Sequence, residues 1–301
     1  MTSNHFLYQI RIDSEIPLPL QKEIFSRSDV SIKYGEELYS PPEEVGACEY
    51  YFAVGPEKAV FYYQDVALFT IIKGCEVFVS PVTGVDCDLL VNTVLGTPMG
   101  ILLLQRGFLV LHASAVEING KITCFLGASG AGKSTTVCSL ICSGHKLVAD
   151  DVVAIKISSS ALPEVLPGYP WMKVGKELIS TLSIPPRNIE HLGSSELKMR
   201  YNVPAESFVE GSSGRLACIY FLEWAEDFSI NQMNMKDSLI NLAKHQYGFV
   251  PKIIYPTEEK QRFLRSAEFI RKIPCFALRH AKSLPKLNHL AGIIEEHIEG
   301  L

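Results

Sequence analysis

The stretch that decides the fold is residues 122–151, which read ITCFLGASGAGKSTTVCSLICSGHKLVADD. An apolar segment leads into a glycine-rich loop, and an amphipathic segment and a second apolar segment follow. Val137, Leu140 and Ile141 recur at helical spacing, and Gly144 stands where a helix cap is expected. The order strand, loop, helix, strand predicts a P-loop core of the α/β class.

The loop has the pattern G-x-x-x-x-G-K-[ST], which predicts a nucleotide site. Glycines let backbone N–H groups turn toward phosphates, and the following helix adds its positive dipole end. We expect Lys133 to reach the β and γ phosphates of ATP and Ser134 to bind Mg²⁺. A glycine-rich turn without a ligand is the alternative, but the strand before it and the helix after it favour a real site. The predicted nucleotide-binding residues are Gly127, Ala128, Ser129, Gly130, Ala131, Gly132, Lys133, Ser134 and Thr135.

Two adjacent aspartates follow the predicted strand Lys146–Ala149, and the first of them comes 17 residues after Lys133. Ligands of open α/β sheets lie outside the carboxyl ends of the strands, so these carboxylates should lie near the γ phosphate. We predict that Asp150 is a catalytic base for an attacking hydroxyl. We predict that Asp151 binds the metal ion, with a purely structural role as the alternative.

A histidine, His112, ends the apolar segment Phe108–His112. If that segment lies beside the phosphate-loop strand, its end faces Asp150, and the imidazole would orient the carboxylate and tune its pKa. The alternative is a hydrogen-bonded core histidine, because spacing alone establishes no contact.

Composition and pattern indicate two globular domains. The 301 residues are 47% hydrophobic and 20% charged, which is enough for a large core. Residues 1–104 should form a β-rich accessory domain, since short apolar segments such as Phe6–Ile12 alternate with turn residues. A helix is expected over Asp88–Leu104, and residues 105–301 should form the catalytic domain.

Charge and hydropathy exclude some partners. A net charge of −5 without basic runs argues against nucleic acid. The longest apolar run, Met99–His112, is interrupted by polar residues, so no membrane segment is expected. We therefore predict a cytoplasmic protein with reduced cysteines.

The motifs together resemble the catalytic domain of the bacterial HPr kinase/phosphorylase family. The resemblance rests on His112, the loop Gly127–Thr135 and the segment Gly144–Asp151, with a weaker likeness at Leu222–Trp224. It implies a P-loop kinase core of the HPr-kinase C-terminal-domain type that uses ATP and Mg²⁺. It also implies that Asp150 is the catalytic aspartate and His112 the histidine that supports it.

The chain departs from that family after the aspartates. Residues Leu166–Lys173 read LPGYPWMK and lack the family's metal-binding glutamate, for which Glu177 is a candidate substitute. The departure implies a kinase without the phosphorylase reaction. The GYP stretch and residues 197–200 instead resemble HPr-kinase-related proteins of ribosomal peptide pathways. These include kinases that phosphorylate the C-terminal serine of lasso-peptide precursors.

Three cations are candidates for substrate contacts. Lys198 and Arg200 alternate with apolar residues, so both should lie on one strand face, where they would neutralise phosphate or bind a substrate carboxylate. Arg215 is a further candidate. The alternative is a solvated face.

These observations predict a Mg-ATP-dependent kinase that phosphorylates a seryl hydroxyl on a peptide or small protein. The preferred acceptor is a lasso precursor peptide at its C-terminal serine. A genuine HPr serine kinase/phosphorylase and a nucleotide-switch ATPase remain as alternatives. The predicted partners include neither nucleic acid nor membrane, and a homo-oligomer is compatible with the sequence.

Overall fold

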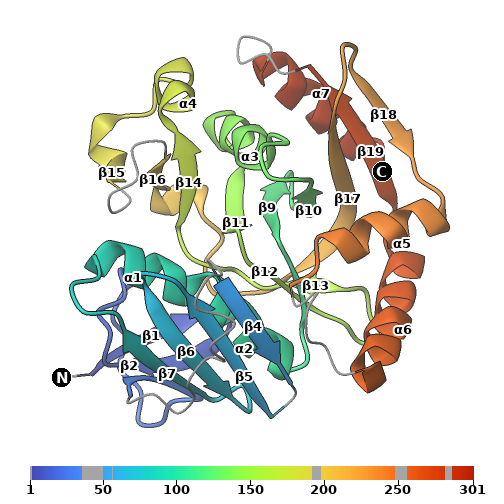
Figure 1. The fold of residues 1–301 in the computed structure, drawn as a ribbon. Helices are drawn as coiled ribbons and strands as arrows, with labels where there is room; N and C mark the ends of the chain where they lie inside the picture. Colours follow the sequence, from blue (N-terminus) through green and yellow to red (C-terminus); the bar gives the residue numbers. More distant parts are fainter. Residues whose placement is uncertain (1, 36–49, 56, 192–197, 248–255, 282–286) are drawn as a thin grey trace. The chain divides into compact units, whose positions relative to one another are not determined.

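The computed structural model describes residues 2–35, 50–55, 57–191, 198–247, 256–281 and 287–301 (Figure 1). The chain divides into two compact units. The first comprises Met1–Val110 with Tyr247–Gln261, and the second comprises Leu111–Gln246 with Arg262–Leu301. The second unit thus differs from the predicted catalytic domain, 105–301, because Tyr247–Gln261 groups with the N-terminal residues. The predicted domain boundary itself stays a prediction.

The first unit is built on a seven-stranded sheet with the order β1-β2-β3-β7-β6-β5-β4. The segment Phe6–Ile12 was expected to be one strand, but Tyr8 and Gln9 both have positive φ and form a turn between two strands. The strands are β1 (Ser3–Leu7), β2 (Ile10–Ser14), β3 (Val30–Tyr34), β4 (Tyr50–Val54), β5 (Lys58–Tyr63), β6 (Ala67–Ile72) and β7 (Glu76–Pro81). The expectation of a β-rich N-terminal part is confirmed.

Two consecutive helices, α1 (Cys87–Leu95) and α2 (Thr97–Gln105), replace the single helix expected over Asp88–Leu104. Gly96 has a non-helical backbone, and Pro98 in the first turn of α2 favours a helix start there. The stretch Cys87–Gln105 is long and apolar enough to cross a membrane by length and composition, yet 61% of it is buried within the protein. Because α2 packs on β5 and β6, we describe this stretch as a core element of the first unit.

The second unit is built on a nine-stranded sheet whose centre is a P-loop core. Strand β10 pairs in parallel with β17, and β17 pairs in parallel with β19. Strand β9 lies between β10 and β11 and is antiparallel to both. The strands are β8 (Leu109–Leu111), β9 (Ala113–Ile118), β10 (Lys121–Leu126), β11 (Lys146–Asp150), β12 (Val153–Lys156), β13 (Glu164–Val165), β17 (Gly214–Trp224), β18 (Ser229–Gln232) and β19 (Cys275–His280).

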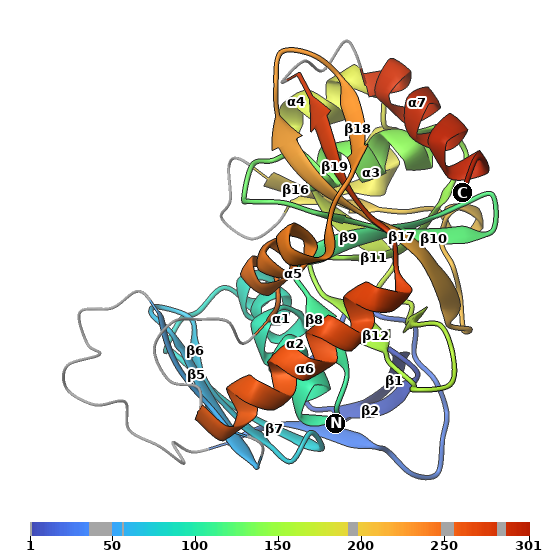
Figure 2. The same cartoon turned by 90° about the vertical axis from the view of Figure 1, so that its right-hand side faces the viewer.

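Helices and a small sheet cover this core. Helix α3 (Lys133–Cys142) packs against α7 (Leu287–Glu299) on one side of the sheet (Figure 2). A three-stranded sheet of the order β14-β16-β15 and helix α4 (Lys176–Thr181) pack nearby. Its strands are β14 (Trp171–Gly175), β15 (Ile189–His191) and β16 (Lys198–Asn202). Side chains of α3, α7, β14 and β16 share one apolar cluster with the inner strands, which holds the predicted P-loop helix in place.

The ends of α3 follow from two glycines. Gly132 precedes the helix with φ of 94°, and Gly144 follows it with φ of 101°. Both values lie in the left-handed region that glycine adopts at little cost. The helix cap predicted at Gly144 is confirmed, since its N–H donates to the carbonyl of Ile141. The α/β fold class is likewise confirmed.

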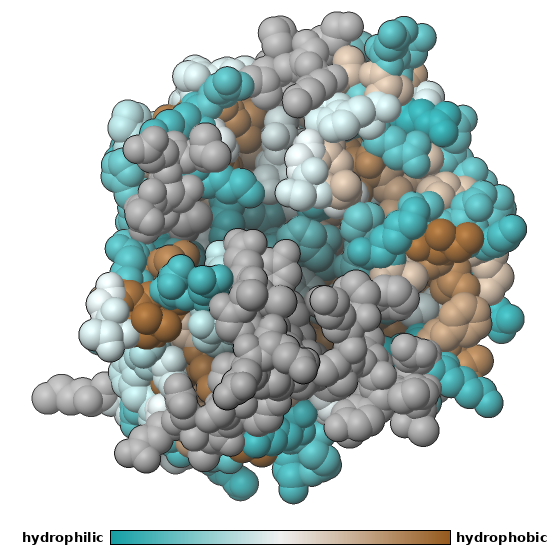
Figure 3. Space-filling model, in the orientation of Figure 1, coloured by the Kyte–Doolittle hydropathy of each residue, from teal (hydrophilic) through white to brown (hydrophobic). Residues whose placement is uncertain are grey.

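Two further helices, α5 (Met235–Lys244) and α6 (Pro256–Lys272), expose apolar side chains. Figure 3 shows apolar surface at the right, where these helices lie in Figure 1. The large apolar residues exposed on them include Met235, Ile240, Phe263 and Leu264. The homo-oligomer named above stays a prediction.

Candidate active site

The phosphate loop connects β10 to α3 and is shaped by glycines. Gly130 and Gly132 have φ of 80° and 94°, so the backbone there takes turns that other residues rarely adopt. The residue before helix α3 is Gly132, which has no side chain that could cap the N–H groups of the first turn. These groups and the helix dipole form an anion site.

The lysine of the loop folds back over its own backbone. The Lys133 ammonium donates to the carbonyl of Gly127 at 2.8 Å and to that of Ala128 at 3.2 Å. Burial lowers the pKa of Lys133, and the charges of Asp150 and Asp151 partly offset this effect. An incoming phosphate would offer this ammonium a charged acceptor in place of two neutral ones.

A row of residues across three strands places the candidate base. Ser114 on β9 lies opposite both Asp150 on β11 and Phe125 on β10. The phosphate loop begins at Gly127, two residues beyond Phe125. The carboxyl ends of β10 and β11 therefore meet at one edge of the sheet, as the sequence predicted for Asp150 and the loop.

Asp150 is only 3% exposed and accepts two hydrogen bonds. The Ser114 hydroxyl donates to Oδ1 at 2.5 Å, and the backbone N–H of Lys173 donates to Oδ2 at 3.2 Å. Burial raises the pKa of the Asp150 carboxyl above its ordinary value, and the Ser114 hydrogen bond opposes the rise. A carboxylate with a raised pKa is a better proton acceptor than an ordinary aspartate.

Asp151 has the opposite electrostatic character. Its φ of 69° turns the chain sharply, and the N–H of Val152 donates back to the carbonyl of Asp150. Lys173 Nζ lies 2.8 Å from Oδ2 of Asp151, and His112 Nδ1 lies 2.9 Å from Oδ1. Burial alone would raise the pKa of Asp151, but the Lys173 charge and the His112 hydrogen bond hold it well below its ordinary value.

The expected contact between His112 and Asp150 is wrong, because His112 pairs with Asp151. The strand beside β10 is β9, which begins at Ala113, and not the segment Phe108–His112. The left-handed turn at Asp151 gives the two neighbouring aspartates separate partners. His112 therefore contacts the neighbour of the candidate base.

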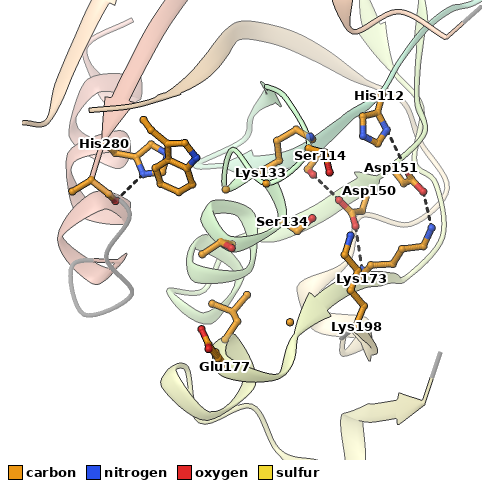
Figure 4. Close-up of a pocket in the computed structure, with 18 residues that line it drawn as sticks. His112, Ser114, Lys133, Ser134, Asp150, Asp151, Lys173, Glu177, Lys198 and His280 are labelled. Atoms are coloured by element: carbon orange, nitrogen blue, oxygen red, sulfur yellow. Dashed lines mark hydrogen bonds and ion pairs between the residues drawn. The ribbon is translucent and has the colours of Figure 1, made fainter. Parts of the chain in front are cut away.

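A cavity of about 700 Å³ joins these groups. In Figure 4 the aspartates and His280 lie at opposite sides of the loop residues Lys133 and Ser134. Glu177, the candidate replacement for the family's glutamate, also faces the cavity from α4. The residues lining the cavity are His112, Ser114, Ser129, Gly130, Gly132, Lys133, Ser134, Thr135, Asp150, Asp151, Lys173, Gly175, Glu177, Leu178, Lys198, Trp224, His280 and Ala281.

The three predicted substrate cations have different places. Lys198 lines the cavity and stays a candidate. The prediction that Arg200 contacts the substrate is corrected, because its side chain is buried. Arg200 pairs with Glu190 at 3.3 Å and lies 5.3 Å from the centre of the Trp171 ring. The prediction that Arg215 contacts the substrate is corrected as well. This residue lies near the start of β17, nine residues from the cavity residue Trp224, which is roughly 30 Å along an extended strand.

Ser114 and Lys173 contact the aspartates but were missed as site residues. Ser114 lies two residues after His112, and Lys173 ends the stretch Leu166–Lys173. No sequence spacing signals their contacts, which depend on pairing across β9 and on the return of β14 to the sheet edge. Trp224 and His280 were missed for the same reason, since they meet only through the pairing of β17 with β19.

Comparison with known proteins identifies relatives of about half of this chain. An HPr kinase/phosphorylase of Thermoanaerobacter sp. (strain X514) is 31% identical over 149 residues, covering 49% of this chain and 43% of that protein. The HPr kinase/phosphorylase of Caldanaerobacter subterraneus subsp. tengcongensis is 28% identical over 154 residues, with the same coverage. The matched half of this chain is HPr kinase-like. The resemblance expected from its motifs is confirmed at that level.

The likeness has clear bounds. This chain spans less than half of the length of these HPr kinase/phosphorylases. A shorter match, to the HPr kinase/phosphorylase of Clostridium acetobutylicum, is 48% identical over 52 residues and covers 17% of each chain. The HPr(Ser) kinase/phosphatase structure from Coxiella burnetii matches 64% of this chain and 94% of that one at 14% identity, with a TM-score of 0.33, too low to carry an argument. No family model matches the chain.

Proposed function

We propose that this protein is a Mg-ATP-dependent kinase that phosphorylates a seryl hydroxyl on a peptide or small protein. One observation carries the proposal: the buried Asp150 carboxylate, with its raised pKa, opens onto the same cavity as Lys133 and Ser134. A proton acceptor and a phosphate site thus lie together. This arrangement suits the transfer of a phosphoryl group to a hydroxyl acceptor.

The residues present suit the cofactors. The loop amides and Lys133 would hold the phosphates of ATP, and the Ser134 hydroxyl would bind Mg²⁺. Both carboxylate oxygens of Asp151 are engaged by His112 and Lys173, so we propose that this predicted ligand acts through water or after rearrangement. Glu177 offers a further oxygen from α4. When bound, ATP supplies the phosphoryl group and Mg²⁺ neutralises charge on its phosphates.

The chain's own groups then control the acceptor. Asp150 accepts the seryl proton at a carboxylate oxygen while the seryl oxygen forms its bond to the γ phosphorus and the bond to the β-phosphate oxygen breaks. Ser114 holds Asp150 in position through its hydrogen bond. Lys173 and His112 keep Asp151 ionised, so the proton goes to Asp150 rather than to its neighbour.

The test is Asp150→Asn. We expect this variant to bind ATP normally but to lose about 10²-fold or more in turnover, because the amide accepts no proton. Asp227→Asn, which removes an exposed aspartate of the same unit, is the matched control and should transfer phosphate normally. Near-normal transfer by Asp150→Asn would refute the assignment of the base. ATP hydrolysis that never labels an acceptor would instead support the nucleotide-switch alternative.

The acceptor is proposed at two levels. The preferred acceptor is a ribosomal precursor peptide of the lasso class, phosphorylated at its C-terminal serine. This preference rests on the resemblance of residues 168–170 (GYP) and 197–200 (LKMR) to kinases of that kind. HPr is the second candidate, favoured by the matches to HPr kinase/phosphorylases. Labelled ATP with each acceptor, followed by mass spectrometry, separates them, and replacement of the acceptor serine by alanine should abolish the label. Either acceptor is consistent with the predicted cytoplasmic location.

A further inference from the structure

The cavity has a second end that the proposed phosphoryl transfer does not use. Trp224 and His280 are the last residues of β17 and β19, and they lie opposite each other in the register of these parallel strands. Their ring centres are 4.5 Å apart, with the ring planes inclined by 55°. Both side chains line the cavity beside the phosphate loop.

The two rings contact the loop itself. A Cβ atom at Gly132 would lie 3.1 Å from Cε1 of His280 and 3.3 Å from Cη2 of Trp224. The rings therefore fill the space that a side chain on the last loop glycine would need. This places an aromatic surface against the start of α3, where phosphates bind in the proposed function.

The two tryptophans of the sequence differ in exposure. Trp224 is 43% exposed, whereas the other tryptophan, Trp171, is 3% exposed and stacks on Tyr169 at 4.2 Å. A large flat ring that is half open to a polar cavity offers a stacking face. One side of the ring is supported by His280, so the indole is held in place before a ligand arrives.

His280 supplies a second, independent observation. It is 5% exposed, and its Nε2 is buried without a hydrogen-bond partner among the described residues. Nδ1 lies 3.3 Å from the carbonyl oxygen of Ala281. Burial lowers the pKa of His280, and the carbonyls of Ala281 and Ala131 partly offset this. The lowered pKa favours the neutral ring, and the buried Nε2 could pair with a polar group of a ligand.

The strand order gives the direction of a nucleotide. Asp150 ends β11, on one side of the loop strand β10, whereas Trp224 and His280 end β17 and β19 on the other side. Three strand spacings of about 4.8 Å separate β11 from β17, or roughly 14 Å. A nucleotide with its terminal phosphate at Asp150 can extend its nucleoside across the loop toward Trp224 within the same cavity.

We propose that the Trp224–His280 pair is the nucleobase subsite of this cavity and that a purine base stacks on the open face of Trp224. This inference rests on the proposed function, because it needs the terminal phosphate at Asp150. Trp224 is then a binding residue, and His280 is a positioning residue that supports the indole.

The two tryptophans provide the test. In Trp171→Phe, Trp224 is the only tryptophan left in the sequence. With excitation selective for tryptophan, we expect ADP with Mg²⁺ to quench its fluorescence while tripolyphosphate, which has no base, leaves it unchanged. In Trp224→Leu, we expect the Kd for ADP to rise about 5- to 100-fold, as for loss of one base–aromatic stack, and the Kd for tripolyphosphate to stay within twofold. Trp224→Phe should retain most of the affinity. Phe263→Leu, which removes an exposed aromatic ring from α6, is the control and should change neither Kd.

Three results would overturn the subsite. Equal loss of ADP and tripolyphosphate affinity in Trp224→Leu would mean that the ring only supports the loop. Unchanged ADP affinity would mean that the base lies elsewhere. If the unaltered protein bound neither ligand, the proposed function would fail together with the subsite, whereas the first two results leave the proposed function intact.

Discussion

Lys173→Gln tests the ion pair that separates the two aspartates. The substitution keeps a polar side chain, shorter by one atom, and removes the charge that lies 2.8 Å from Oδ2 of Asp151. Asp151 would keep its contact with His112 but lose its main electrostatic partner. We expect the protein to become less stable at pH 7.

The magnitude follows from distance and exposure. Two unit charges at this distance attract by about 6 kcal/mol at an effective dielectric constant of about 20. Desolvation of both ions opposes most of this, and the side chains are 27% and 19% exposed. We therefore expect the free energy of unfolding to fall by about 1–3 kcal/mol, with a drop in Tm of roughly 2–4 °C for each kcal/mol.

The pH dependence gives a sharper readout. The folded pKa of Asp151 lies below its unfolded value, so the pair's contribution is complete above the unfolded pKa of about 3.9. It is lost as the pH falls below that value toward the folded pKa. The stability difference between the unaltered protein and Lys173→Gln should thus be largest at neutral pH and shrink below about pH 4.

Urea unfolding followed by circular dichroism at several pH values measures this difference. Lys176→Gln is the matched control, since Lys176 is an exposed lysine three residues away. If Lys173→Gln lowered the free energy of unfolding at pH 7 no more than Lys176→Gln, the ion pair would have no energetic role. A difference that grew on acidification would contradict the sign of the argument.

Two further substitutions test the site. Ser114→Ala removes the donor to Oδ1 of Asp150, so the pKa of that carboxyl should rise further. The acidic limb of the pH–rate profile should then move to higher pH, with little change in rate above it. An unmoved limb would show that Asp150 is not the titrating base. Arg200→Met should lower the free energy of unfolding by about 1–3 kcal/mol, because the contacts with Glu190 and Trp171 are lost. The KM for the acceptor should stay unchanged. A raised KM with normal thermal stability would instead indicate that Arg200 contacts the substrate.

The parts of the site that are local in sequence could be predicted. The loop, helix α3 and the placement of Asp150 follow from one continuous strand–loop–helix–strand unit, because each element leads directly into the next. The aspartate end of β11 must then lie at the same sheet edge as the loop. Nothing beyond residues 122–151 is needed for that inference.

The partners of the aspartates could not be predicted. Ser114 reaches Asp150 because an antiparallel strand is inserted between β10 and β11, and neither spacing nor residue type reveals that insertion. Lys173 lies 22 residues beyond Asp151 and returns through β14. His112 pairs with Asp151 rather than Asp150 because the backbone at Asp151 has a positive φ. Aspartate tolerates this conformation but does not require it, so the sequence does not reveal it.

The row formed by Asp150, Ser114 and Phe125 has a consequence for how this chain can vary. The proposed base sits at the end of a strand and is held by a neighbouring strand, so its coordinates are set by sheet register. Loops that meet the acceptor can then change in length or composition without moving the carboxylate. In such a scaffold, the loops would determine the acceptor and the sheet would position the proposed base. Changes in the loops alone could then direct the same proposed reaction to new acceptors.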